Sequence, residues 1–199
     1  MKKNRNFIRI VRFILIGMGI IISIHPLYAQ VQAPEEGFFH GDHDKPLLGR
    51  VVLVVDDDPT IHFCAKVQLS GIYGAKNVVC VSKGHEGIRI LRDRAINIDA
   101  VVVDLYMSNT NVDGEVNGDK AMDGDEVAMR IRMLPDFCDI PIILHSSDDE
   151  RSEELRHKVL DTADGPHYLF DGVCSKGNYR DMTSLIKQYS DDRLRRRAT

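Results

Sequence analysis

The sequence predicts an α/β fold in which helices cover both faces of a five-stranded parallel sheet. From residue 50 onward, short apolar runs rich in β-branched residues alternate with longer stretches of helical periodicity, and the alternation repeats five times. The apolar runs are continuous rather than alternating with polar residues, which is typical of strands buried on both faces. We therefore expect five strand–helix units in chain order.

The first predicted elements lie between residues 51 and 104. In chain order they are strand 51–55, helix 59–70, strand 77–81, helix 85–94 and strand 100–104. Pro59 suits the first turn of its helix, because proline lacks only a donor that would be unpaired there. Ile88 and Leu91 share one face of the second helix. The third strand stays apolar until its last residue, Asp104.

The remaining elements follow a long polar stretch. In chain order they are helix 124–133, strand 141–145, helix 149–162, a fifth strand within 168–175 and helix 180–194. Val127, Ile131 and Leu134 keep helical spacing in the first of these helices. Residues 149–162 are predicted to form a charged helix.

The ends of the chain lie outside this pattern. Residues 1–29 resemble a secretory signal, with basic residues before an apolar stretch that is short for a membrane span. An export signal, an uncleaved membrane anchor and translation from Met18 all stay open, and membrane contact is undecided. Residues 30–48 are predicted to be a linker, residues 49–194 the folded domain, and residues 195–199 a solvated basic tail.

The composition narrows the partners. The formal net charge is -4, so the chain lacks the basic surface of nucleic-acid binders, and we expect no nucleic-acid partner. Its four cysteines have no metal-ligand spacing, which predicts reduced, structural thiols. They are Cys64, Cys80, Cys138 and Cys174.

Polar side chains gather where predicted strands end. They are Asp56, Asp57 and Asp58 after the first strand, Asp104 at the third, Ser146 and Ser147 after the fourth, and Lys176 after the fifth. Ligands of open parallel sheets bind at this edge. Any single Asp there is ordinarily a turn or cap residue. Together, carboxylates suited to Mg²⁺ and a lysine that can hold a phosphoryl oxygen predict a phosphoryl-transfer site.

Five motifs extend this pattern. They are VVLVVDDDP (51–59), VVVDL (101–105), MDG (122–124), PIILHS (141–146) and SK (175–176). With them, residues 50 to about 190 resemble the receiver domain of bacterial two-component response regulators, of the single-domain type. The resemblance implies a flavodoxin-like sheet in strand order 2-1-3-4-5. It also implies a histidine kinase or histidine phosphotransfer protein as phosphoryl donor, and output through protein contact or onward transfer.

The resemblance assigns roles to the site residues. Asp104 would accept the phosphoryl group, Asp57 would bind Mg²⁺ directly, and Asp56 would act mostly through metal-bound water. The backbone carbonyl of Tyr106 would complete the protein's share of the metal shell. The two remaining side chains, Ser146 and Lys176, would contact the phosphoryl oxygens.

The chain departs from the family pattern in three places. Gly177 stands where receivers commonly have proline, which leaves the loop after the fifth strand open. Val173 stands where many have an aromatic switch residue. Residues 108–121 are an insertion whose acidic positions do not match an EF-hand, so we expect a solvated loop. His145 could relay protons, although a core histidine paired with backbone is the plainer interpretation.

Two other functions stay open. A Mg²⁺-dependent phosphohydrolase of the aspartate-nucleophile class would have a second acid two residues after its nucleophile, where this chain has Tyr106. A phosphorylation-independent pseudo-receiver would lack some of the expected side chains, and all are present. We expect a switch protein rather than an enzyme, one that assists its own phosphorylation and dephosphorylation. Dependence on ATP-charged donors predicts a cytoplasmic location, with export or membrane anchoring as the alternative.

Overall fold

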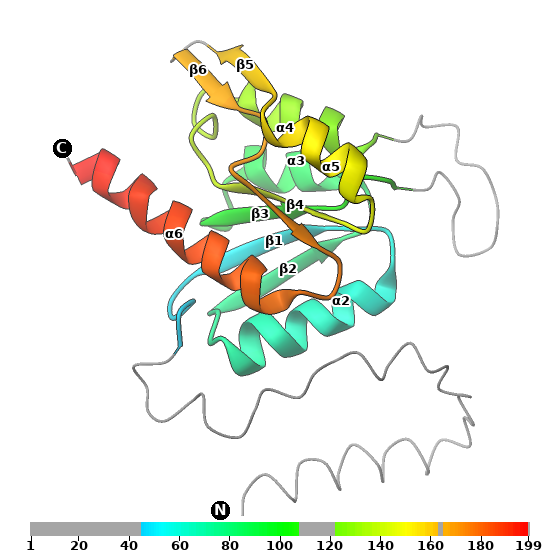
Figure 1. Ribbon diagram of the computed structural model, residues 1–199. Coiled ribbons are helices and arrows are strands. Elements are labelled where there is room, and N and C mark those ends of the chain that lie inside the picture. Colours follow the sequence, from blue (N-terminus) through cyan, green and yellow to red (C-terminus); the bar gives the residue numbers. More distant parts are fainter. Residues whose placement is uncertain (1–44, 108–121, 163–164, 199) are drawn as a thin grey trace, which may run out of the picture. The chain divides into compact units, whose positions relative to one another are not determined.

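The computed structural model describes residues 45–107, 122–162 and 165–198 (Figure 1). Five strands form one parallel sheet in the order β2-β1-β3-β4-β7. They are β1 (Val51–Val55), β2 (Asn77–Val81), β3 (Ala100–Val103), β4 (Ile142–Ser146) and β7 (Gly172–Ser175). Because β7 is the fifth strand of this sheet, the predicted flavodoxin-like order 2-1-3-4-5 is confirmed.

Helices cover both faces of the sheet, as predicted (Figure 1). They are α2 (Pro59–Ala65), α3 (Gly84–Asp93), α4 (Gly124–Arg132), α5 (Asp149–Arg156) and α6 (Tyr179–Ala198). Successive side chains of a strand point to opposite faces. In β1, Leu53 and Val55 therefore join the core with α3, α4 and α5, whereas Val52 and Val54 join the core with α2 and α6.

Two helix predictions need correction. The helix predicted over 59–70 changes after α2 into a π-helix, η3 (Lys66–Ile72). The helix predicted over 149–162 ends at Arg156, and β5 (Val159–Thr162) then pairs antiparallel with β6 (Gly165–Tyr168). β-branched residues at both ends of β5 favour a strand. Leu160 packs against the core, which fixes the hairpin on the domain.

The folded domain is longer than expected at both ends. Leu47, assigned to the linker, is fully buried and its N–H donates to Tyr73. At the other end, the residues predicted to form a basic tail continue α6 as far as Ala198. Arg193 and Arg197, one turn apart, both pair with Asp139, which explains why the helix continues.

Several predictions fall outside the described residues. They concern the signal-like segment 1–29, the linker up to residue 44 and the insertion 108–121. Among the residues that are described, no helix is both long and apolar enough to cross a membrane.

A buried arginine at the end of α4 connects this helix to the segments that precede β4 and β7 and to the β5–β6 hairpin. Arg132 is 1% exposed and donates to the backbone carbonyls of Cys138, Ile140 and Tyr168. It also donates to Asp171 Oδ2 at 2.7 Å, and this carboxylate oxygen accepts from Ile142 N–H as well. Removing the guanidinium would leave several buried acceptors and one carboxylate without their partner.

We predict that Arg132→Met lowers the free energy of unfolding by about 3–5 kcal/mol, the usual cost of breaking a buried ion pair from one side. Arg130→Met is the matched control on the same helix, because Arg130 pairs with Glu126 at the surface. The control should cost less than about 1 kcal/mol. Urea unfolding of both variants measures the difference, and equal losses would contradict the structural role given to Arg132.

Candidate functional site

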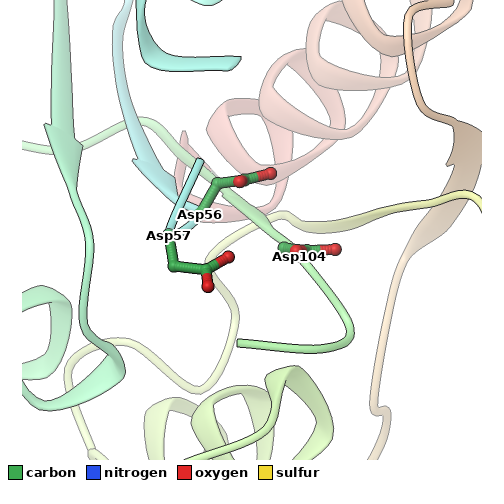
Figure 2. Close-up of side chains that lie close together, drawn as sticks. All are labelled: Asp56, Asp57 and Asp104. Atoms are coloured by element: carbon green, nitrogen blue, oxygen red, sulfur yellow. The ribbon is translucent and has the colours of Figure 1, made fainter. Parts of the chain in front are cut away.

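Three aspartates meet at the carboxyl-terminal edge of the sheet (Figure 2). Asp56 and Asp57 directly follow β1, and Asp104 directly follows the neighbouring strand β3. One carboxylate oxygen from each lies within 4.8 Å of the others. Asp104 N–H donates to Val55 and Asp56 N–H to Val81, so the strand ladder extends to the acidic residues. The predicted grouping of these three carboxylates is present.

A lysine from β7's end spans the cluster. Lys176 Nζ lies 2.8 Å from Asp104 Oδ2 and 3.1 Å from Asp56 Oδ2. Strand order creates this contact, because β7 reaches the aspartates only across β4. Residues more than 70 positions apart along the chain thus form one charged group.

Burial sets the protonation of these groups. Burial raises the pKa of Asp56 to about 6, and the neighbouring Asp104 charge adds to this effect. Burial also raises the pKa of Asp104, although the hydrogen bond and charge of Lys176 oppose the shift. For Lys176, burial acts to lower the pKa, but the two carboxylates outweigh it and the pKa is raised. The lysine therefore carries its charge at neutral pH.

The aspartates fit a divalent cation. Three carboxylates face a single ammonium group, which leaves excess negative charge at the edge. Asp56 Oδ2 is buried, and the Lys176 ammonium 3.1 Å from it is shared with Asp104, so this oxygen is only partly compensated. A buried carboxylate oxygen in this state is costly. A cation that prefers oxygen ligands and keeps several waters, such as Mg²⁺, is the group that this arrangement suits.

Asp58, the third consecutive aspartate, has a structural task. Its side chain accepts from Thr60 N–H at 2.7 Å and caps α2. Its own N–H donates to Asp56 Oδ1 at 2.9 Å, which orients the Asp56 carboxylate. The ordinary interpretation of an Asp after a strand thus holds for Asp58.

The two other predicted site residues are Tyr106, which lies in the loop after β3, and Ser146, the last residue of β4. Ser146 is buried, and its Oγ accepts from Asp148 N–H at 3.0 Å, which leaves its hydroxyl proton available. The side chain of Tyr106 is exposed, and its hydroxyl donates to Asp148 at 3.0 Å. This bond links the loops after β3 and β4. The metal-binding role of the Tyr106 carbonyl stays a prediction.

His145 is paired with backbone, as its plainer interpretation predicted. Its Nε2 accepts from Gly177 N–H at 3.1 Å. Gly177 has φ +88°, which proline cannot adopt and other L-residues rarely adopt. Gly177 therefore gives the loop after β7 a backbone conformation that proline cannot adopt, with an N–H available to the imidazole.

Sequence reasoning missed the close approach of α4 to the phosphoacceptor candidate. A Cβ built on Gly124 would lie 2.1 Å from the Asp104 carbonyl oxygen. Gly124 N–H also donates to Leu105 O at 2.8 Å. The signal in the sequence was the glycine of the MDG motif (122–124), because a residue without a side chain permits a close approach of backbone. The first turn of α4 is thereby held against the backbone of Asp104.

Solved receiver domains have a similar fold. A response regulator receiver domain from Clostridium thermocellum has a TM-score of 0.53 at 18% identity, covering 73% of this chain and 97% of that one. A receiver domain of a signal transduction histidine kinase from Syntrophus aciditrophicus has a TM-score of 0.52 at 21% identity. The match covers 72% of this chain and 92% of that one. A response regulator receiver protein from Sinorhizobium medicae has a TM-score of 0.52 at 19% identity. The match covers 72% of this chain and 95% of that one. The chain has the CheY-like fold of receiver domains.

Sequence comparison, unlike structural comparison, finds no match for the chain. No protein-family model matches the chain, and no curated protein matches it. The structural likeness, at identities of 18–21% in these three cases, is therefore a likeness of fold.

We predict a pH-dependent effect of Asp56→Asn in the metal-free protein. In the folded protein the pKa of Asp56 is raised to about 6 from an ordinary 3.8. The fold therefore favours the protonated carboxyl group. Its contribution to the free energy of unfolding is complete below pH 3.8 and is lost as pH rises through about 6. The amide keeps the oxygen that accepts from Asp58. The free energy of unfolding of the variant should therefore exceed that of the wild type by about 2–3 kcal/mol near pH 7.5. This difference should disappear near pH 4.

Urea unfolding in a chelator at both pH values measures this effect. Asp161→Asn, an exposed position on β5, is the control and should change little at either pH. An Asp56→Asn variant that is destabilised equally at both pH values would contradict the electrostatic account.

We also predict that Gly124→Ala destabilises the protein by about 1–3 kcal/mol or more, because its methyl group would meet a backbone oxygen that cannot rotate away. Gly71→Ala is the control, since a Cβ on Gly71 meets nothing within 4 Å. That exposed helical position should be neutral or stabilised by up to ~1 kcal/mol. Thermal unfolding of both variants tests the contact, and similar midpoints would exclude it.

Proposed function

We propose that this chain is a phosphoryl-accepting receiver that takes a phosphoryl group on Asp104 with the help of Mg²⁺. The observation that carries the proposal is the Lys176 ammonium, 2.8 Å from Asp104 and 3.1 Å from Asp56, at the ligand-binding edge of a receiver-type sheet. An isolated aspartate at a strand end would not need the ammonium group of a lysine from two strands away.

Asp104 is proposed as the nucleophile. Its carboxylate oxygen would attack phosphorus in a phosphohistidine or a small acyl phosphate, forming a new O–P bond as the bond to the leaving group breaks. Lys176 supports this role because it opposes the effect of burial and favours the ionised carboxylate that attack requires. The product would be an acyl phosphate on Asp104, with the donor imidazole or carboxylate as leaving group.

Lys176 and Ser146 are proposed to receive the phosphoryl oxygens. The ammonium that now contacts both carboxylates would turn one contact toward a phosphoryl oxygen, where it acts as a point charge. Ser146 can donate its hydroxyl proton, because its oxygen already accepts from Asp148. Ser146 ends β4 and Lys176 directly follows the neighbouring strand β7, and Lys176 N–H donates to Ser146 O at 3.0 Å.

Mg²⁺ is proposed to bind through Asp56, Asp57, Asp104 and the carbonyl of Tyr106. When bound, it would supply charge neutralisation between the acceptor carboxylate and the incoming phosphoryl oxygens. The excess of three clustered carboxylates over one shared ammonium group supports such a ligand.

The proposed donors are a histidine kinase or a histidine phosphotransfer protein. Structural neighbours include a receiver domain of a signal transduction histidine kinase, which supports this class of partner. Such donors are charged by ATP, so we propose a cytoplasmic site of action. We propose no nucleic-acid partner, in keeping with the net charge of -4. The chain would be a switch that assists its own phosphorylation and dephosphorylation, rather than an enzyme.

We predict that Asp104→Asn abolishes phosphoryl uptake while the fold is kept, because an amide is nearly isosteric with the carboxylate but is not a nucleophile. Incubation with Mg²⁺ and acetyl phosphate, followed by intact-mass analysis, should give one phosphoryl group on the wild type and none on this variant. Asp161→Asn, at the exposed hairpin, should be labelled like the wild type.

The same experiment separates the competing functions. Labelling of Asp104→Asn at wild-type yield would refute the assignment of the nucleophile. Steady release of phosphate from a phosphate ester without net labelling would favour a hydrolase. A wild type that gains no phosphoryl group and binds no Mg²⁺ would favour a pseudo-receiver.

A further inference from the structure

The side chain of His145 reaches the loop that carries Lys176. His145 lies on β4, is 1% exposed, and accepts the Gly177 N–H at its Nε2. The phosphoryl chemistry proposed above does not use this imidazole. Its bond partner, however, is the residue directly after the lysine that the chemistry depends on.

Two consecutive residues of β4 hold two consecutive residues of this loop. Ser146 O accepts from Lys176 N–H at 3.0 Å, and His145 Nε2 accepts from Gly177 N–H at 3.1 Å. The first bond continues the strand ladder and can form with any residue except proline at position 176. The second needs an acceptor side chain on β4 and a free N–H at position 177. It fixes the peptide group that links Lys176 to Gly177.

The imidazole is suited to a permanent acceptor role. Burial, together with the nearby charge of Lys176, lowers the pKa of His145 to about 3, so the ring is neutral at physiological pH. Acceptance at Nε2 then places the proton on Nδ1. The Tyr179 ring packs beside it, with centroids 5.8 Å apart at an interplanar angle of 50°. Burial, the Lys176 charge and the Gly177 N–H donor thus favour the neutral ring with Nε2 as acceptor.

We propose that His145 is a positioning residue that holds the Lys176–Gly177 peptide, and thereby the Lys176 ammonium, in place for phosphoryl transfer. This inference rests on the proposed function. Lys176 Nζ must lie between Asp104 and Asp56, and its side chain is 24% exposed, so packing alone restrains it only in part. A shift of its backbone by about 1 Å would displace the ammonium, and misplacement of that size is enough to slow a reaction strongly.

Two substitutions separate positioning from packing. His145→Phe keeps an aromatic ring against Tyr179 but removes the acceptor. His145→Gln puts an amide oxygen the same number of bonds from the backbone as Nε2, so it can accept from Gly177. We expect the Phe variant to slow acetyl-phosphate labelling at saturating Mg²⁺ by at least about tenfold. The Gln variant should stay within about threefold of the wild type. Mg²⁺ affinity should change little in both, because the aspartates are untouched.

A double-mutant cycle tests whether the effect passes through the lysine. In a Lys176→Met background, His145→Phe should slow the remaining reaction by less than about twofold, since no ammonium is left to position. A purely structural role would give the same fold-change in both backgrounds. That additivity would overturn the proposal, as would equal rates for wild type and the Phe variant, or equal loss in the Gln and Phe variants.

A measurement on the wild type keeps the inference testable if the Phe variant does not fold. An NMR scalar coupling between the Gly177 amide nitrogen and the His145 Nε2 should be detected across their hydrogen bond. Its absence would overturn the positioning role. If the wild type accepts no phosphoryl group at all, the proposed function fails and the positioning role falls with it. If the wild type is labelled and the coupling is absent, only the positioning role fails.

Discussion

The contact between Lys176 and the carboxylates of Asp104 and Asp56 is the interaction on which the site depends. It requires strands β1, β3, β4 and β7 to lie side by side in that order, because each contributes its carboxyl-terminal end to the same edge. The apolar faces of these strands supply the two cores that keep the sheet rigid. A charged group is costly to bury unless it is paired, so the Lys176 ammonium offsets part of the cost of burying the two carboxylates.

The same edge is supported from several directions. Asp58 orients the Asp56 carboxylate, the first turn of α4 packs against the Asp104 carbonyl, and His145 holds the loop after β7. Asp58 and His145 act through hydrogen bonds, and α4 can approach Asp104 because Gly124 has no side chain. Lys176 compensates the buried Asp56 carboxylate only in part, because burial still raises its pKa to about 6, and a cation bound there would relieve the remaining cost.

Much of this was predictable from the sequence, for physical reasons. Continuous valine-rich runs identify strands buried on both faces, and strand ends identify the ligand-binding edge, so the sheet and its acidic residues could be placed. Prediction was wrong where local patterns compete. The segment after Arg156 is polar enough for a surface helix, yet it forms the β5–β6 hairpin, whose Leu160 packs on the core. Contacts such as Gly124 against Asp104 depend on tertiary geometry that periodicity does not contain.

The measurement that tests the central claim most directly is the location of the acyl phosphate. Protein treated with Mg²⁺ and acetyl phosphate can be reduced with borohydride, which converts a phosphorylated aspartate to homoserine, and then digested for peptide mapping. The account predicts homoserine at position 104 and at no other aspartate. Homoserine at position 56 or 57, or none anywhere in a protein that binds Mg²⁺, would contradict it.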